Sequence, residues 1–544
     1  MTFIKMQNVC YKYNGKKENA IENVNLQIRQ GEFVLLAGAS GCGKSTLLKT
    51  FNGIIPQESL GNMDGDILID NISTRNLKIS EISKKIGVVF QNPDDQIFAT
   101  TVFDEVAFAL ENRNEDAYRI KAAVDEVLSQ VGLDGFADRK VSALSGGQKQ
   151  RMTLAAIMVG KPDFLILDEP ISQIDPQGAK ELLNILSEIN QVNKTTIIIV
   201  EHRIHEVIKS CKRLIVMDKG RIVWDGIQND LVKDYALLQK LGLRLPQSME
   251  LLNSLKLKNG LWTTEEIIAS ITNKYEVNKK IEEKYSMKSL NKDSICKIKN
   301  LSFAYNKKDK RILREINFKI AKGEFIALMG KNGSGKTTLI KLLTNLLQTN
   351  EGRIDFSGEK RIGLVLQNPD LMLFNFTVRE EVRCESVQKK IKIAEPIYRE
   401  ILDKLALSSL EDEFPLTLSR GQRFRVAIAS TLLAKPDILI LDEPTTGQDI
   451  RNINSVVDLL NEYLTNGGTV LCCTHDMEIA VQNASRVIIL ANGKIHADGT
   501  VRDVFNIEGI EDVAGIVLPE IAHIAEGLYG KRDFSIEEVL KHVQ

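Results

Sequence analysis

The sequence predicts an α/β protein made of two tandem copies of one domain. The motif G-x-x-x-x-G-K-[ST] occurs twice, at Gly38–Thr46 and at Gly330–Thr338. An apolar run typical of a strand precedes each motif, and a run with helical character follows it. Later segments also recur in order, because VVFQNPD, LSGGQ and LILDEP in the first half return as LVLQNPD, LSRGQ and LILDEP in the second. A strand, a glycine-rich loop and a helix in this order predict two domains of the P-loop NTPase class.

The length and composition agree with two globular domains and argue against several other classes. A chain of 544 residues exceeds what one hydrophobic core fills, and 43% hydrophobic with 26% charged residues is ordinary for globular proteins. The net charge of −1 argues against a large basic surface for nucleic acid. No apolar run approaches the ~18 residues that cross a bilayer, and the N-terminus lacks the apolar core of a signal peptide. The seven cysteines lack C-x-x-C spacing, which argues against zinc or iron–sulfur sites, so we expect a soluble, reduced protein in the cytoplasm.

Each copy is expected to begin with an antiparallel β subdomain, because FIKMQNVCYKY and ICKIKNLSFAY alternate as strands do. The near-continuous apolar runs FLILDE and TTIIIVE, with ILILDE and TVLCCTH in the second copy, predict a core of mainly parallel strands buried on both faces. A charged helical section carries LSGGQ or LSRGQ, and a helical tail closes each copy. The expected divisions are domain 1 over residues 1–240, a helical tail and linker over 241–294, domain 2 over 295–512, and a C-terminal helical tail over 513–544.

The two glycine-rich loops are the candidate phosphate sites, because glycine lets backbone N–H groups and a helix N-terminus face an anion. Lys44 and Lys336 are expected to reach the β- and γ-phosphates, while Ser45 and Thr337 would hold Mg²⁺. Cys42 lies inside the first loop, where the helix N-terminus and Lys44 are expected to lower the pKa of its thiol. The candidate phosphate-binding residues are Gly38, Ser40, Gly41, Gly43, Lys44, Ser45 and Thr46 in the first copy, and Gly330, Asn332, Gly333, Gly335, Lys336, Thr337 and Thr338 in the second.

Paired carboxylates follow the apolar strand of each LILDEP motif. Asp168 and Asp442 end these strands, and a carboxylate that emerges from a buried strand near a phosphate site suits Mg²⁺. Glu169 and Glu443 come next in the sequence and, because side chains alternate along a strand, are expected to point differently. These two glutamates are the candidate general bases that polarise the attacking water.

Two further pairs of polar residues recur in register with these carboxylates. Gln91 and Gln367 carry neutral amides that can contact Mg²⁺ or the attacking water. His202 and His475 follow buried strands and are expected to contact the γ-phosphate.

In this order the motifs resemble those of ABC-type ATPases, and the chain is similar over nearly its full length to two fused ATP-binding cassettes. More narrowly, it resembles the double-cassette ATPase of energy-coupling-factor (ECF) importers of vitamins and metal ions. That narrower resemblance lies in QNPDDQIF at Gln91–Phe98, TVFDEVAF at Thr101–Phe108 and FNGIIP at Phe51–Pro56.

The resemblance assigns roles to several further residues. Tyr13 and Tyr305 would stack on adenine. The LSGGQ loop would complete the nucleotide pocket of the opposite cassette, so the two cassettes would pair within one chain. Its expected contacts are Ser145, Gly146, Gly147 and Gln148 in the first copy, and Ser419, Gly421 and Gln422 in the second. Arg420 replaces a glycine in the second copy and is expected to add bulk and charge beside a polyphosphate. Asp175 and Asp449 match the D-loop that couples the two sites.

The resemblance implies an Mg²⁺-dependent ATPase that drives an importer from the cytoplasmic face of the cell membrane. Its partners would be an integral membrane transport subunit and a small membrane substrate-binding subunit, with no nucleic acid. Two other functions remain as alternatives. A ribosome-associated ABC-F ATPase would carry a long charged insert between its cassettes, whereas the tail after Gly226 has a counterpart after Gly499. A double-cassette sugar importer would usually have one decayed site, whereas both copies here keep lysine, aspartate, glutamate and histidine.

Overall fold

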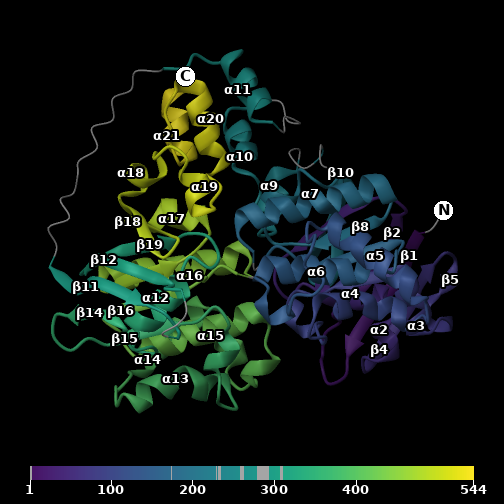
Figure 1. Ribbon diagram of the computed structural model, residues 1–544, viewed down its shortest axis with the longest axis horizontal. Coiled ribbons are helices and arrows are strands. Elements are labelled where there is room, and N and C mark those ends of the chain that lie inside the picture. The colour runs from purple at the N-terminus through teal and green to yellow at the C-terminus, as the bar shows by residue number, and fades with distance from the viewer. Residues whose placement is uncertain are drawn as a thin grey trace. The chain divides into compact units, whose positions relative to one another are not determined.

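The computed structural model describes residues 3–172, 174–227, 230, 234–257, 263–278, 293–306, 310–446 and 448–543 (Figure 1). The chain folds into two compact units, Met1–Trp262 and Thr263–Gln544. Both combine a mainly parallel sheet with an antiparallel sheet and helices, which confirms the predicted α/β class. Among the described residues, none of the helices has the length and apolar character needed to cross a membrane.

The first unit is organised around a six-stranded sheet of order β10-β9-β3-β8-β7-β6. Five of its strands are parallel, and β10 pairs antiparallel with β9 at the edge. The strands are β3 (Phe33–Gly38), β6 (Ile86–Val89), β7 (Phe164–Asp168), β8 (Thr196–Val200), β9 (Arg213–Asp218) and β10 (Arg221–Ile227). An antiparallel sheet of order β2-β1-β4-β5 comprises β1 (Phe3–Tyr13), β2 (Ile21–Arg29), β4 (Gly61–Ile69) and β5 (Ile72–Ser73).

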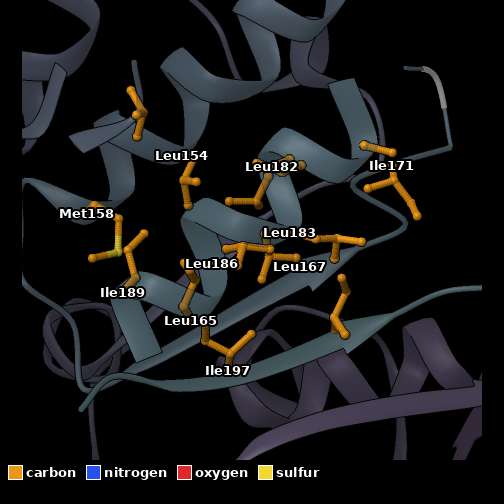
Figure 2. Packing of buried hydrophobic residues seen from close by; sticks show 14 of the residues in the cluster. Leu154, Met158, Leu165, Leu167, Ile171, Leu182, Leu183, Leu186, Ile189 and Ile197 are labelled. Carbon is orange, nitrogen blue, oxygen red and sulfur yellow. The ribbon is translucent and has the colours of Figure 1, made fainter. Parts of the chain in front are cut away.

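Helices cover the first unit's sheets and carry its polar loops. They are α1 (Lys44–Phe51), α2 (Ile54–Gln57), α3 (Ile79–Lys85), α4 (Val102–Glu111), α5 (Ala117–Gln130), α6 (Gly146–Met158), α7 (Pro176–Asn193), α8 (Ile204–Val207), α9 (Tyr235–Lys240) and α10 (Gln247–Ser254). Figure 2 shows how α6 and α7 pack over β7 and β8. The side chains in this layer include Leu154, Met158, Leu165, Leu182 and Ile197, all buried in one cluster.

The second unit repeats the topology, with strand order β15-β16-β17-β13-β18-β19. These strands are β13 (Phe325–Met329), β15 (Ile362–Val365), β16 (Ile438–Asp442), β17 (Thr469–Cys473), β18 (Arg486–Ala491) and β19 (Lys494–Gly499). The antiparallel sheet of order β12-β11-β14 comprises β11 (Ser294–Phe303), β12 (Leu313–Ala321) and β14 (Glu351–Phe356). The helices are α11 (Thr264–Thr272), α12 (Lys336–Leu343), α13 (Val378–Gln388), α14 (Glu395–Lys404), α15 (Arg420–Leu433), α16 (Ile450–Thr465), α17 (Met477–Asn483), α18 (Val501–Phe505), α19 (Ile510–Ala514), α20 (Glu520–Tyr529) and α21 (Ile536–His542).

The segment expected to be a tail and linker, 241–294, is divided between the two units. Helix α10 belongs to the first unit, whereas α11 belongs to the second and packs against α20 (Figure 1). Gly527 of α20 permits this contact, because a Cβ there would lie 2.2 Å from Cδ1 of Ile268 on α11. Asn278, which follows α11 in the sequence, also contacts the C-terminal helix α21, because its N–H donates to the carbonyl of His542 at 2.8 Å. Residues 258–262 and 279–292 of this segment lie outside the described residues.

Candidate active sites

Each glycine-rich loop wraps around the ammonium group of its own lysine. Lys44 Nζ donates to the carbonyl oxygens of Gly38 at 2.8 Å and Ala39 at 3.0 Å, and Lys336 Nζ bonds the second loop in the same way. Gly38 has no room for a side chain, because a Cβ there would lie 2.3 Å from the carbonyl oxygen of Met217. The loop therefore places a buried positive charge beside the first amides of the following helix, as a phosphate site requires.

The strand-end aspartates meet the hydroxyl groups that follow the lysines. Thr337 Oγ1 lies 3.4 Å from Asp442 Oδ2, and a hydrogen bond likewise joins Ser45 to Asp168. Burial raises the pKa of Asp168 to about 6, with a smaller contribution from the adjacent Glu169. Burial also raises the pKa of Asp442. A hydroxyl and a desolvated carboxylate provide oxygen donors only, which is the donor set that Mg²⁺ prefers.

In the first unit, two of the predicted residues contact the carboxylate of a third. Glu169 Oε2 accepts a hydrogen bond of 2.6 Å from Gln91 Nε2, and Glu169 Oε1 lies 3.2 Å from His202 Nε2. The backbone of Glu169 is left-handed, with φ of 47°, while its N–H donates to Val200 across the sheet. A non-glycine residue in this conformation is uncommon and costs free energy, which is typical of functional positions.

The second unit holds its glutamate differently. Glu443 has the same left-handed backbone, with φ of 50°, and its Oε1 lies 3.2 Å from His475 Nε2. Its Oε2 accepts the backbone N–H of His475 at 3.2 Å, and His475 Nε2 also lies 3.1 Å from Asn332 Oδ1. Burial raises the pKa of Glu443 to about 8, against the opposing charge of Lys336. Gln367 contributes a backbone contact, because its carbonyl accepts from Arg420 Nη2 at 3.4 Å.

The two tyrosines at the ends of the first strands lie next to the phosphate loops. Tyr13 OH is 3.2 Å from Thr46 Oγ1, and Tyr305 OH is 3.4 Å from Thr338 Oγ1. Tyr305 remains 52% exposed. An exposed ring tied to the nucleotide loop is suitably placed for a base, and stacking on adenine stays a prediction.

Comparisons with known proteins decide the family. The family model described as "ABC transporter" matches residues 21–172 and 313–446, one copy in each unit. The chain belongs to the ABC transporter family. A protein of Methanosarcina mazei, provisionally named an ABC transporter ATP-binding protein, is 40% identical and covers 99% of this chain and 96% of its own. A Methanosarcina acetivorans protein with the same provisional name is 40% identical, covering 99% and 91%.

A solved structure shares the two-cassette fold. The archaeal ribosome recycling factor aABCE1, in complex with the stalk protein aP1, is 20% identical with a TM-score of 0.59, covering 92% of this chain and 91% of that one. This likeness concerns the fold alone. Membership of the ABC family makes both units ATP-binding domains, and the protein is an ATPase.

The two ABC signature loops begin their helices with capping boxes. Ser145 Oγ accepts the N–H of Gln148 at 3.3 Å, while Gln148 Oε1 accepts the N–H of Ser145 at 3.0 Å. Ser419 and Gln422 form the same pair at 3.3 and 2.9 Å. Serine and glutamine therefore fix the entry of α6 and α15, and contacts from this loop to a nucleotide stay predictions.

The D-loop aspartates also act as helix caps. Asp175 accepts the N–H of Gly178 at 2.8 Å to begin α7, and Asp449 accepts the N–H of Asn452 at 2.9 Å to begin α16. Gln173 and Gly447 of these loops lie outside the described residues.

Arg420 makes a contact within its own cassette, because its guanidinium donates to the backbone carbonyl of Gln367 at 3.4 Å. Its expected place beside a polyphosphate stays a prediction. A second contact lies nearby, an ion pair of 3.0 Å between Arg423 Nε and Asp370. Both contacts join the signature helix α15 to the segment that begins at Gln367. In the first cassette, Lys149 Nζ and Asp94 form the corresponding pair at 2.6 Å.

Sequence reasoning missed these ion pairs and a buried glutamate, Glu201, that directly precedes His202. The signal for the pairs was available, because both copies place a basic residue four positions after the signature serine and an aspartate three positions after the glutamine. The signal for Glu201 was its mismatch with Thr474 in the other copy.

The expectation of a reactive Cys42 is wrong. Its side chain turns into the core beneath the loop and is 5% exposed, with Sγ 4.0 Å from Lys44 Nζ. Burial raises the pKa of the Cys42 thiol, and the opposing effect of Lys44 is smaller.

Maleimide labelling of the nucleotide-free protein should therefore modify the half-exposed Cys10 and Cys384 first. Cys42 should react at least about tenfold more slowly, because its thiol is buried and protonated. Peptide mass spectrometry over a time course measures each rate. The replacement Cys42→Ala should leave the pattern at Cys10 and Cys384 unchanged, and early labelling of Cys42 would contradict its burial.

The raised pKa of Glu443 predicts how stability depends on pH. Between about pH 4.5 and 8 the folded state binds a proton at Glu443 that the unfolded state releases, so the free energy of unfolding falls as pH rises through this window. In Glu443→Gln this contribution disappears. Calorimetry without nucleotide should show a Tm drop between pH 5.5 and 8.5 that is smaller by a few degrees, on the scale of about 2–4 °C per kcal/mol. The exposed-residue variant Glu359→Gln is the control, and an unchanged drop in Glu443→Gln would refute the assignment.

Proposed function

We propose that this ABC ATPase is the motor subunit of an importer of the energy-coupling-factor type. It would drive uptake of a vitamin or metal ion through separate membrane subunits, from a peripheral position on the cytoplasmic face of the membrane. The observation that carries the proposal is a pair of exposed aromatic clusters, one after Gln91 and one after Gln367, in which Phe98 and Phe374 occupy corresponding positions.

In the first cassette these aromatics follow Gln91 closely. Phe98 is 60% exposed and Phe108 on α4 is 42% exposed, and their ring centroids lie 4.2 Å apart. The loop that carries Phe98 is fixed in place, because the N–H groups of Phe98 and Ala99 donate to the buried carboxylate of Glu105 at 3.1 and 2.8 Å. A rigid platform therefore presents apolar rings to solvent.

The second cassette also exposes aromatic side chains after Gln367, and Phe374 corresponds to Phe98. Phe374 and Phe376 are 79% and 82% exposed, and Phe376 stacks on Phe414. Glu381 fixes this loop as Glu105 fixes the first, by accepting the N–H of Phe374 at 2.6 Å. Exposed clusters of aromatic side chains mark interaction surfaces, and two such clusters suit a membrane partner that offers one apolar helix to each cassette.

The chemistry assigned to each cassette follows from its own residues. Lys44 and Lys336 would bind the β- and γ-phosphates, and Tyr13 and Tyr305 the adenine. Ser45 with Asp168, and Thr337 with Asp442, offer the oxygen donors for Mg²⁺, with Gln91 and Gln367 as further candidates. Bound Mg²⁺ would neutralise charge on the phosphate oxygens.

Glu169 and Glu443 would polarise the attacking water, while His202 and His475 would orient the glutamates and contact the γ-phosphate. The cassettes would pair within the chain so that each signature loop meets the other's nucleotide. Closure on two ATP molecules and reopening after hydrolysis would then move the membrane subunit.

Affinity purification of the tagged full chain from detergent-solubilised native membranes tests the partner. Small integral membrane proteins should copurify with the wild type. Their yield should fall at least about fivefold in the double variant Phe98→Asp/Phe374→Asp, because a buried charge without a partner weakens an apolar interface. Val192→Asp, at a 71% exposed position on α7, is the matched control. Copurification of ribosomal proteins in place of membrane proteins would favour the ABC-F alternative.

Steady-state hydrolysis tests the catalytic carboxylates. Glu169→Gln and Glu443→Gln should each lower ATP turnover, and the double variant should lower it more than about tenfold, because the general base is lost. Binding of a fluorescent ATP analogue should persist, since the lysines remain. Normal turnover in the double variant would exclude these glutamates as bases.

A further inference from the structure

Glu201 is a buried carboxylate that joins two catalytic segments of the first cassette. It follows β8 directly and is 1% exposed. Its Oε2 accepts the backbone N–H of His202 at 3.1 Å. Its Oε1 accepts the backbone N–H of Ile171 at 3.0 Å, in the loop that runs from Glu169 to the D-loop Asp175. One side chain therefore fixes the histidine and the D-loop segment relative to each other.

The backbone carbonyl and the side chain of Ile171 are also fixed. Its carbonyl accepts a hydrogen bond from Arg203 Nη2, and Arg203 is itself fixed by Glu206 at 3.2 Å. Its side chain is fully buried in the cluster beneath α6 and α7, where Figure 2 shows it beyond the end of β7. The peptide group of Ile171 is thus clamped between Glu201 and Arg203 while its side chain is anchored in the core.

The second cassette places different side chains at these positions. Thr474 stands in place of Glu201, and its Oγ1 accepts the N–H of Asp476 at 2.9 Å. Asp476 stands in place of Arg203 and caps α17 by accepting the N–H groups of Glu478 and Ile479. Ile171 is replaced by Thr445, which is only half-buried.

The difference between Glu201 and Thr474 is accompanied by different contacts at the proposed general bases, Glu169 and Glu443. In the second cassette, the N–H of His475 donates to Glu443 itself at 3.2 Å. In the first, Glu201 accepts the equivalent N–H of His202, and Glu169 instead bonds Gln91 at 2.6 Å. The presence of Glu201 thus coincides with a general base that faces the segment leading to the exposed aromatics.

We propose that Glu201 is a positioning residue of the first cassette that locks His202 to the D-loop segment and leaves Glu169 to pair with Gln91. The second site lacks this lock, so hydrolysis at the two sites depends on different contacts. The inference rests on the proposed hydrolysis at both sites.

The test compares Glu201 variants of the full chain in two backgrounds. Glu443→Gln leaves turnover to the first site, and Glu169→Gln leaves it to the second. In the Glu443→Gln background, Glu201→Thr, which copies the second cassette, should lower kcat about 5- to 20-fold with KM for ATP within about twofold, as expected for the loss of two buried hydrogen bonds. Glu201→Gln keeps one acceptor and should cost less. In the Glu169→Gln background, neither change should alter kcat by more than about twofold.

Hydrogen exchange supplies a readout that does not depend on activity. The amides of Ile171 and His202 should exchange at least about tenfold faster in Glu201→Thr, while those of Thr445 and His475 keep their rates. Equal losses of kcat in both backgrounds would show a general folding defect and overturn the proposal. Faster exchange without a change in kcat would do so as well. If Glu169→Gln and Glu443→Gln together leave turnover normal, the proposed function fails first, and this inference falls with it.

Discussion

The structure depends on one constraint, which is that the parallel strands of each core end at the same edge. Strands β3 and β7 are separated by β8 alone, so the loop after β3 and the carboxylates after β7 emerge side by side. Lys44 then lies close enough to Asp168 to oppose the rise in its pKa. Because all flanking strands are buried, these polar groups are desolvated, and each needs a partner from a neighbouring loop. The histidine after β8 and the glutamine after β6 are those partners.

Most of this arrangement could be predicted from the sequence, because it follows from motifs on a repeated frame. The glycine-rich loops and the strand-end Asp168 and Asp442 lie where the motifs place them. The pairing of each glutamate with its histidine was not predicted and is seen only in the structure. The directions in which side chains point could be predicted less well from the sequence. Cys42 lies in a loop that binds anions, yet its Cβ points into the core, and no pattern of neighbouring residues reports that direction. The contact of Arg420 with the carbonyl of Gln367 in its own cassette was likewise not indicated by the sequence.

The two cassettes share a topology and differ in the contacts that hold their candidate catalytic groups. Glu169 of the first bonds Gln91, whereas Glu443 of the second accepts the backbone N–H of His475. These differences arise from a few substitutions between the copies, such as glutamate for threonine before the histidine. Aligning the two halves of the chain against each other is therefore more informative than reading either alone.

The packing of α11 has a consequence for how the chain is made. By its place in the repeat, α11 is the counterpart of α21 and belongs to the first copy, yet it packs on α20 of the second. During synthesis, α11 leaves the ribosome about 250 residues before α20, so its contact with α20 forms only after the second copy has been made. A gene cut where the second sequence copy begins, near residue 294, would separate α11 from α20. The boundary between the two folded units, after Trp262, therefore precedes the boundary between the two sequence copies.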